Sequence, residues 1–179
     1  MSKAAESLFQ KAREAAARHD LPKAIENASA AAKLDSARPE LWTFLGELHF
    51  NAGTFAKSVE ALRLALRASN HEASAFHNLA VALKREGAFG EAEALLRESI
   101  RRDPQKTASV LSLSDLLVMG ARRDEAQKLL TQSLISTPHN FDYLRELTNL
   151  FIQDGRYGEA VTYAEQFVAR NGQTIPALE

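Results

Sequence analysis

The sequence predicts an all-α solenoid of five helical hairpins in tandem, and a 34-residue period is the main reason. Small residues recur at this interval, at Ala24, Ser58, Ala92, Ala126 and Ala160. Large apolar residues follow the same interval, at Leu45, Leu79, Leu113 and Leu147. No insertion or deletion interrupts the period between Ala5 and Thr174. A fixed period of this length is typical of stacked helical repeats.

The composition is that of a soluble globular protein and limits the function classes. The 179 residues are 45% hydrophobic and 25% charged, with a formal net charge of -1. This charge gives no general attraction to nucleic acid or anionic membrane. The absence of cysteine excludes disulfides and thiolate metal sites. Because there is also no long apolar segment, we expect a cytoplasmic protein without a membrane span.

The second unit shows why each unit is expected to hold two helices. Pro39 suits a first helical turn, and apolar residues at helical spacing follow it. Gly53 can end this helix in the left-handed conformation. A second helix is expected from about Ala56 to near Asn70, and Asn70 can cap the next helix. The apolar residues of the two helices are Leu41, Phe44, Leu45, Leu48, Ala52, Val59, Leu62 and Leu66.

The other units repeat these turns. Gly87 and Gly155 occupy the position of Gly53, while His19 and Ala121 stand where glycine would be expected. Prolines mark two of the loops between units. We therefore expect a single domain over 1–179, with repeats at 5–38, 39–72, 73–106, 107–140 and 141–174 and a tail at 175–179.

The small residues predict close contact between the helices of a hairpin. Gly46 on the first helix and Ser58 on the second would let the two backbones approach, with large neighbours filling the space around the crossing.

These residues carry a family resemblance. The second unit reads Trp42, Leu45, Gly46, His49, Ser58, Leu62, Ala65 and Asn70, and the third reads Phe76, Leu79, Ala80, Leu83, Ala92, Leu96, Ser99 and Pro104. The pattern resembles the tetratricopeptide-repeat (TPR) signature and covers 170 of 179 residues. The resemblance implies a right-handed superhelix whose first helices line a concave groove for a peptide or a partner helix. It implies architecture and binding, not a chemical activity.

The resemblance also implies which residues face that groove. They are Phe9, Arg13, Glu47, Phe50, Asn51, His77, Val81, Lys84, Arg85, Leu111, Asp115, Val118, Arg145, Asn149 and Ile152. The apolar members suggest a hydrophobic floor for an amphipathic helix or an extended peptide. For Phe9 and Val118 the alternative is packing between neighbouring first helices.

Charged residues suggest the character of the partner. Of the chaperone-tail carboxylate clamp found in some TPR proteins only Asn78 has a counterpart, so we expect no clamp. Lys84, Arg85, Arg122 and Arg123 should lie along one edge, where they either anchor an acidic segment or form a solvated surface. With acidic groups in the groove as well, we expect a protein or peptide partner of mixed charge and no nucleic acid.

We expect no enzyme, no cofactor and no metal site. No two of the five histidines have the spacing of a helical metal site, and the common nucleotide and nucleophile motifs are absent. His49 occupies an aromatic position of the signature and is best interpreted as a packed ring.

The end of the fifth unit offers a second function. Only a short segment containing Pro176 follows, so Tyr163, Phe167 and Val168 are expected to form an exposed edge. This edge either self-associates or docks another protein, or the chain is a piece of a longer one. The alternative is that Phe167 folds over the last hairpin and acts as its cap. The sequence thus favours an adaptor that binds a partner in its groove, with a self-assembling scaffold and homo-oligomer as the second hypothesis.

Overall fold

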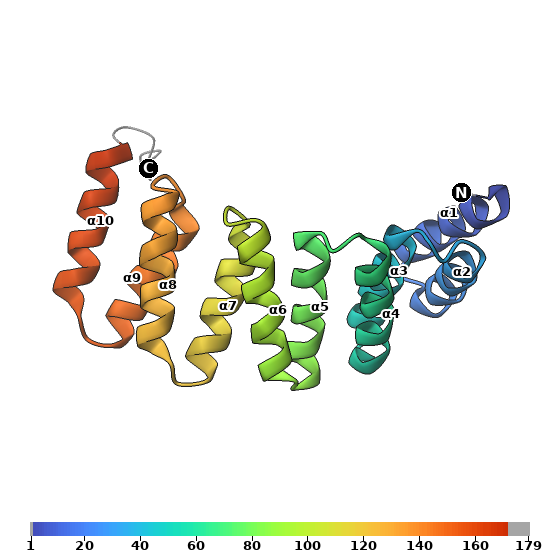
Figure 1. Ribbon diagram of the computed structural model, residues 1–179, viewed down its shortest axis with the longest axis horizontal. Coiled ribbons are helices and arrows are strands. Elements are labelled where there is room, and N and C mark those ends of the chain that lie inside the picture. The colour runs from blue at the N-terminus through green and yellow to red at the C-terminus, as the bar shows by residue number, and fades with distance from the viewer. Residues whose placement is uncertain (1, 172–179) are drawn as a thin grey trace. The chain divides into compact units, whose positions relative to one another are not determined.

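The computed structural model describes residues 2–171 and consists there of ten helices without strands. The all-α solenoid fold is confirmed. In Figure 1 the two helices of each hairpin run in opposite directions. The expected tail at 175–179, with Pro176, lies outside the described residues. Within the described part, no helix is both long and apolar enough to cross a bilayer.

The chain forms two compact units, Met1–Arg102 and Asp103–Glu179. The first unit contains α1 (Lys3–Ala17), α2 (Leu21–Leu34), α3 (Pro39–Asn51), α4 (Phe55–Ala68), α5 (Ala73–Glu86) and α6 (Phe89–Arg102). The second contains α7 (Thr107–Met119), α8 (Arg123–Ser136), α9 (Phe141–Gln153) and α10 (Tyr157–Asn171). Each odd-numbered helix packs against the helix that follows it, which is the predicted hairpin.

One left-handed residue closes every hairpin turn. Its φ is 60° at His19, 72° at Gly53, 89° at Gly87, 58° at Ala121 and 72° at Gly155. The hydrogen bonds repeat as well, since the next residue donates to a carbonyl five positions back, as Thr54 N does to His49 O at 2.9 Å. This is the Schellman pattern, which satisfies the free carbonyl groups at a helix end.

The loop between α4 and α5 differs from the prediction. Asn70 was expected to cap α5, but Glu72 holds the N-cap position and makes no side-chain capping bond. Asn70 and His71 instead adopt left-handed φ values of 51° and 62°. Asparagine tolerates this conformation better than most residues, so Asn70 serves the change in chain direction rather than the helix end.

The close approach within the second hairpin is confirmed. Ser58 Oγ donates a buried hydrogen bond of 2.8 Å to the carbonyl oxygen of Gly46. A Cβ atom at Gly46 would lie 2.6 Å from Leu62 Cγ, closer than side-chain atoms normally come. Glycine is therefore required here for packing, and Leu62 fills the space that it leaves.

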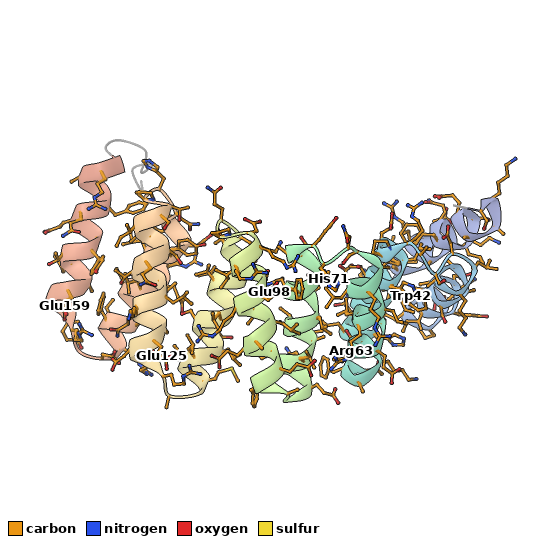
Figure 2. All side chains as sticks on the ribbon, in the orientation of Figure 1. Trp42, Arg63, His71, Glu98, Glu125 and Glu159 are labelled. Atoms are coloured by element: carbon orange, nitrogen blue, oxygen red, sulfur yellow. The ribbon has the colours of Figure 1, made fainter. Side chains whose placement is uncertain are left out.

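Polar contacts connect neighbouring hairpins of the first unit. Arg63 on α4 pairs with Glu91 on α6 at 2.7 Å, and Trp42 Nε1 donates to Ser36 O at 2.9 Å. Figure 2 labels Arg63 and Trp42 among the side chains of this unit. Arg102 on α6 donates to the carbonyl oxygen of His71 at 2.8 Å and stacks over the Phe76 ring at 4.8 Å. The two contacts of Arg102 hold the loop before α5 and the first turn of α5, the helix that carries part of the candidate site.

His49 is a packed ring, as the sequence analysis suggested. Its side chain is half-buried, and Nδ1 lies 2.9 Å from the hydroxyl of Thr54 in the hairpin turn. Burial lowers the pKa of His49 below its usual value, which is consistent with a structural rather than an acid-base role.

Candidate functional site

A hollow of about 340 Å³ lies in the first unit between α3 and α5. Residues of α3 and α5 line it, and Leu62 of α4 lies behind them. Five of the predicted groove residues meet here, namely Glu47, Phe50, Asn51, His77 and Val81. The other lining residues are Gly46, Leu62 and Asn78.

The floor of the hollow is apolar because α3 has no side chain at Gly46. Gly46 and Leu62 are both buried, whereas the remaining lining residues are half-buried or exposed. Gly46 and Leu62, the pair whose close approach requires glycine, are thus both lining residues of the hollow.

Phe50 forms an aromatic wall that the protein holds in place. Its ring meets the Phe55 ring edge-on, with 5.5 Å between centroids. The guanidinium group of Arg85 lies 5.7 Å from the Phe50 centroid and 5.0 Å from that of Phe55. Such cation-π contacts contribute about 0.5–1 kcal/mol at exposed sites. Arg85, predicted as a groove contact, thus fixes the wall and does not line the hollow.

The rim is polar and carries groups without partners. Glu47 and Asn51 are exposed and Asn78 is half-buried. Their side chains make no hydrogen bond or ion pair with residues 2–171. Although Glu47 is exposed as a residue, neighbouring atoms partly desolvate its carboxyl group, and this raises its pKa above the usual value. A desolvated carboxylate and two carboxamides beside an apolar floor are suited to binding a polar chain with apolar side groups.

Asn78 was not among the predicted groove residues. The sequence analysis noted it only as a remnant of a carboxylate clamp. It lies beside His77 on α5, and both line the hollow. The sequence analysis predicted His77 but not its neighbour Asn78, whereas the hollow is wide enough to include both residues.

Phe9 packs between neighbouring first helices. Its half-buried ring meets Phe44 of α3 edge-on, with 5.3 Å between centroids. This contact corresponds to the alternative considered for Phe9 in the sequence analysis. Arg13, on the same helix, is exposed.

The remaining predicted groove residues lie on α7 and α9 of the second unit. Leu111 and Val118 are half-buried, while Ile152 is 48% exposed. Asp115 and Asn149 are exposed. The exposed Arg145 pairs with Asp142 at 3.0 Å.

The predicted basic edge is largely neutralised within the protein. Arg122 pairs with Glu125 at 2.6 Å, and Arg123 pairs with Asp154 at 2.9 Å. Lys84 is half-buried at the end of α5. Ion pairs already formed at the surface leave little attraction for an acidic partner.

Of the two alternatives considered for the end of the fifth unit, the structure favours packing of Phe167. Phe167 is only 8% exposed, and its ring lies 6.2 Å from that of Phe141. Tyr163 is half-buried and stacks on Phe151 at 5.4 Å. Only Val168, at 49%, presents a large apolar surface. Phe167 fills the space between α10 and α9, as the capping alternative proposed.

Family models of known sequences place the chain in a family. Two tetratricopeptide-repeat family models match it, at residues 9–73 and 83–150. No curated protein sequence matches it. A crystal structure of MamA protein is 15% identical over 100% of both chains, with a TM-score of 0.78.

Two further structures are similar. PilF of Pseudomonas aeruginosa is 18% identical over 96% of this chain and 78% of its own, with a TM-score of 0.73. YrrB, described as a TPR protein with an unusual peptide-binding site, is 15% identical over 93% of this chain and 86% of its own, with a TM-score of 0.65. At such identities the likeness concerns the fold alone. The chain belongs to the tetratricopeptide-repeat family, whose members generally serve as protein-interaction modules.

Proposed function

We propose that the protein is an adaptor that holds an extended segment of a partner protein in the hollow between α3 and α5. The observation that carries this proposal is the meeting of an apolar floor with the partnerless amides of Asn51 and Asn78 in one concavity. The volume of about 340 Å³ lies at the lower end of the range of ligand sites, roughly 300–1,000 Å³. It suits one or two side chains of a peptide rather than a large cofactor.

The two amides favour an extended segment over an amphipathic helix. A carboxamide can donate to a backbone carbonyl and accept from a backbone N–H at the same time. In an extended peptide these groups are free, whereas in a helix they are bonded internally. Phe50 and Val81 then offer apolar contact to alternate side chains. The structure of YrrB, similar in fold, is described as containing a peptide-binding site.

A defined peptide pool tests this proposal. Immobilised full-length protein is incubated with a pool of nine-residue peptides of degenerate sequence, blocked at both ends, and the bound fraction is analysed by mass spectrometry. We expect the protein to retain a subset of the pool. Phe50→Glu should abolish retention because it removes the aromatic wall and places a second carboxylate beside Glu47. Asn78→Ala should weaken retention without affecting the fold.

A matched substitution controls for the change in charge and hydrophobicity. Phe89 on α6 is 47% exposed and lies outside the hollow, so Phe89→Glu should leave retention unchanged. Circular dichroism verifies that each variant remains folded. Retention that survives both Phe50→Glu and Asn78→Ala, or no retention at all, would contradict the proposed function.

A second candidate function is self-association through the exposed face of α10. Tyr157, Val161 and Val168 are 64%, 55% and 49% exposed. Their separations of four and seven residues place them on one face of the helix. Large apolar side chains aligned on a surface are typical of protein contact sites. Val168 belongs to the edge proposed from the sequence, while Phe167 does not contribute.

Light scattering coupled to size exclusion, over a concentration series, tests the second candidate. Self-association predicts a mass above 19.7 kDa that rises with concentration and that Val161→Glu with Val168→Glu returns to the monomer value. Phe167→Glu is unsuitable because a buried charge would disturb the fold. A monomer at every concentration would exclude the scaffold hypothesis.

A further inference from the structure

Glu47 is an acidic residue of the hollow without a cation. Glu40 lies about two turns before Glu47 on the same face of α3 and is paired with Arg38. Glu47 has no such partner anywhere in residues 2–171. Arg85, a predicted groove cation, lies over the rings of Phe50 and Phe55. Glu47 therefore lines a concavity without a protein cation beside it. A cationic group of a ligand could form a charge-assisted hydrogen bond with this carboxylate, which water solvates only in part.

The surroundings of Glu47 strengthen this argument. Its pKa is raised by desolvation alone, so no neighbouring charge compensates the carboxylate. Asn51 and Asn78 on the same rim are neutral, and Phe50 and Val81 provide apolar surface next to it. Glu47 is thus the carboxylate among the lining residues of the hollow, and His77 is the other titratable residue there.

We propose that the partner segment presents a lysine or arginine side chain to Glu47, with its aliphatic stem against Phe50 and Val81. This inference rests on the proposed function and specifies its ligand. Long cationic side chains combine an apolar stem with a charged end, which is the combination that the wall and the rim offer. An acidic side chain would meet Glu47 as a like charge, and a purely apolar one would leave the carboxylate covered and unpaired.

The residues that a degenerate peptide pool enriches test the inference directly. The same blocked nine-residue pool is bound to wild-type protein, Glu47→Gln and Glu47→Lys, and the residues enriched in each bound fraction are compared. Wild-type protein should enrich lysine or arginine at one position by roughly fivefold, as expected for a partly desolvated ion pair. Glu47→Gln should remove this enrichment while peptides are still retained. Glu47→Lys should replace it by enrichment of aspartate or glutamate.

A charge-matched control separates a local ion pair from general attraction. Glu60 is exposed on α4 and is not a lining residue of the hollow. Glu60→Gln changes the net charge by the same amount and should leave the enrichment of basic residues intact. Equal losses in Glu47→Gln and Glu60→Gln would overturn the inference, because the preference would then reflect overall charge.

The outcomes distinguish this inference from the function on which it rests. Retention that requires Phe50 and Asn78 but shows no basic preference, or one unchanged in Glu47→Gln, overturns the inference and leaves the adaptor function standing. Absence of retention, or retention independent of Phe50 and Asn78, overturns both. Enrichment of basic residues that is lost in both Glu47 variants and kept in Glu60→Gln supports both.

Discussion

Ala121 adopts a conformation in the turn before α8 that costs free energy for any residue with a Cβ. Its φ of 58° is equivalent to that of the glycines at 53, 87 and 155. Gly120, the preceding residue, has an ordinary φ of -82°. The 34-residue period therefore decides which residue is left-handed, even where a glycine lies one position away.

Ala121→Gly should stabilise the protein by about 1 kcal/mol. The left-handed conformation costs alanine roughly 1–2 kcal/mol, and the greater freedom of glycine in the unfolded chain offsets part of the gain. Thermal unfolding measures the change as a higher Tm. Gly120→Ala is the matched comparison. Its φ is ordinary and the added Cβ would lie 3.5 Å from its nearest neighbour, Leu117 O, so the reduced freedom of the unfolded chain should stabilise the protein by about 0.4–1 kcal/mol. A lower Tm for Ala121→Gly would contradict this account of the turn.

The residues differ in how far the sequence could predict them. Gly53, Gly87 and Gly155 could be predicted because glycine at a repeated helix end has one common structural reason. Asn70 could not, since asparagine serves both as an N-cap and as a left-handed residue, and the choice depends on the course of the loop. Phe167 could not be placed because its burial depends on the Phe141 ring contributed by another helix.

At the scale of the elements, a polar network joins α8 to the turn between α9 and α10. Gln127 is only 7% exposed, and its Nε2 donates to Asp154 at 2.7 Å. Its Oε1 accepts from Arg156 at 2.7 Å. Arg123 reaches the other carboxylate oxygen of Asp154, and Arg156 also lies 4.7 Å from the Phe151 ring centroid. One buried amide thus links two hairpins of the second unit.

Gln127→Ala should destabilise the second unit by about 1–3 kcal/mol, the usual cost of removing one member of a buried hydrogen-bonded set. Hydrogen exchange followed by mass spectrometry should show faster exchange in α8, α9 and α10. Gln132, exposed on the same helix, provides the control, and Gln132→Ala should change exchange little. Unchanged exchange in these helices after Gln127→Ala would show that the network does not hold the hairpins together.

The helices themselves follow from the sequence, whereas this network does not. Pro39 marks the start of α3, and the apolar spacing after it matches the buried face that the structure shows. Gln127 occupies a position that is Val59 in the second repeat and Val161 in the fifth. The third repeat also has a polar residue here, Glu93. The identity of Gln127 alone gives no indication of its partners, because Asp154 and Arg156 come from the next hairpin.

At the scale of the whole molecule, the candidate site is formed by two neighbouring hairpins, and only part of it could be predicted from the repeat pattern. The family pattern predicted Glu47, Phe50, Asn51, His77 and Val81, which meet in one hollow. It could not predict that Arg85 turns to the aromatic wall, since that contact depends on the ring of Phe55 across the hairpin turn. The volume of the hollow depends likewise on how closely Leu62 approaches Gly46.

The central claim is that the hollow between α3 and α5 binds a peptide. The side-chain amide resonances of Asn51 and Asn78 test it most directly, because these groups lack partners in the described structure. Isotope-labelled protein is titrated with a peptide retained from the pool. We predict that both carboxamide signals shift together with the backbone amides of Glu47 and Phe50. Shifts confined to α10, or unperturbed signals of Asn51 and Asn78 at saturation, would contradict the claim.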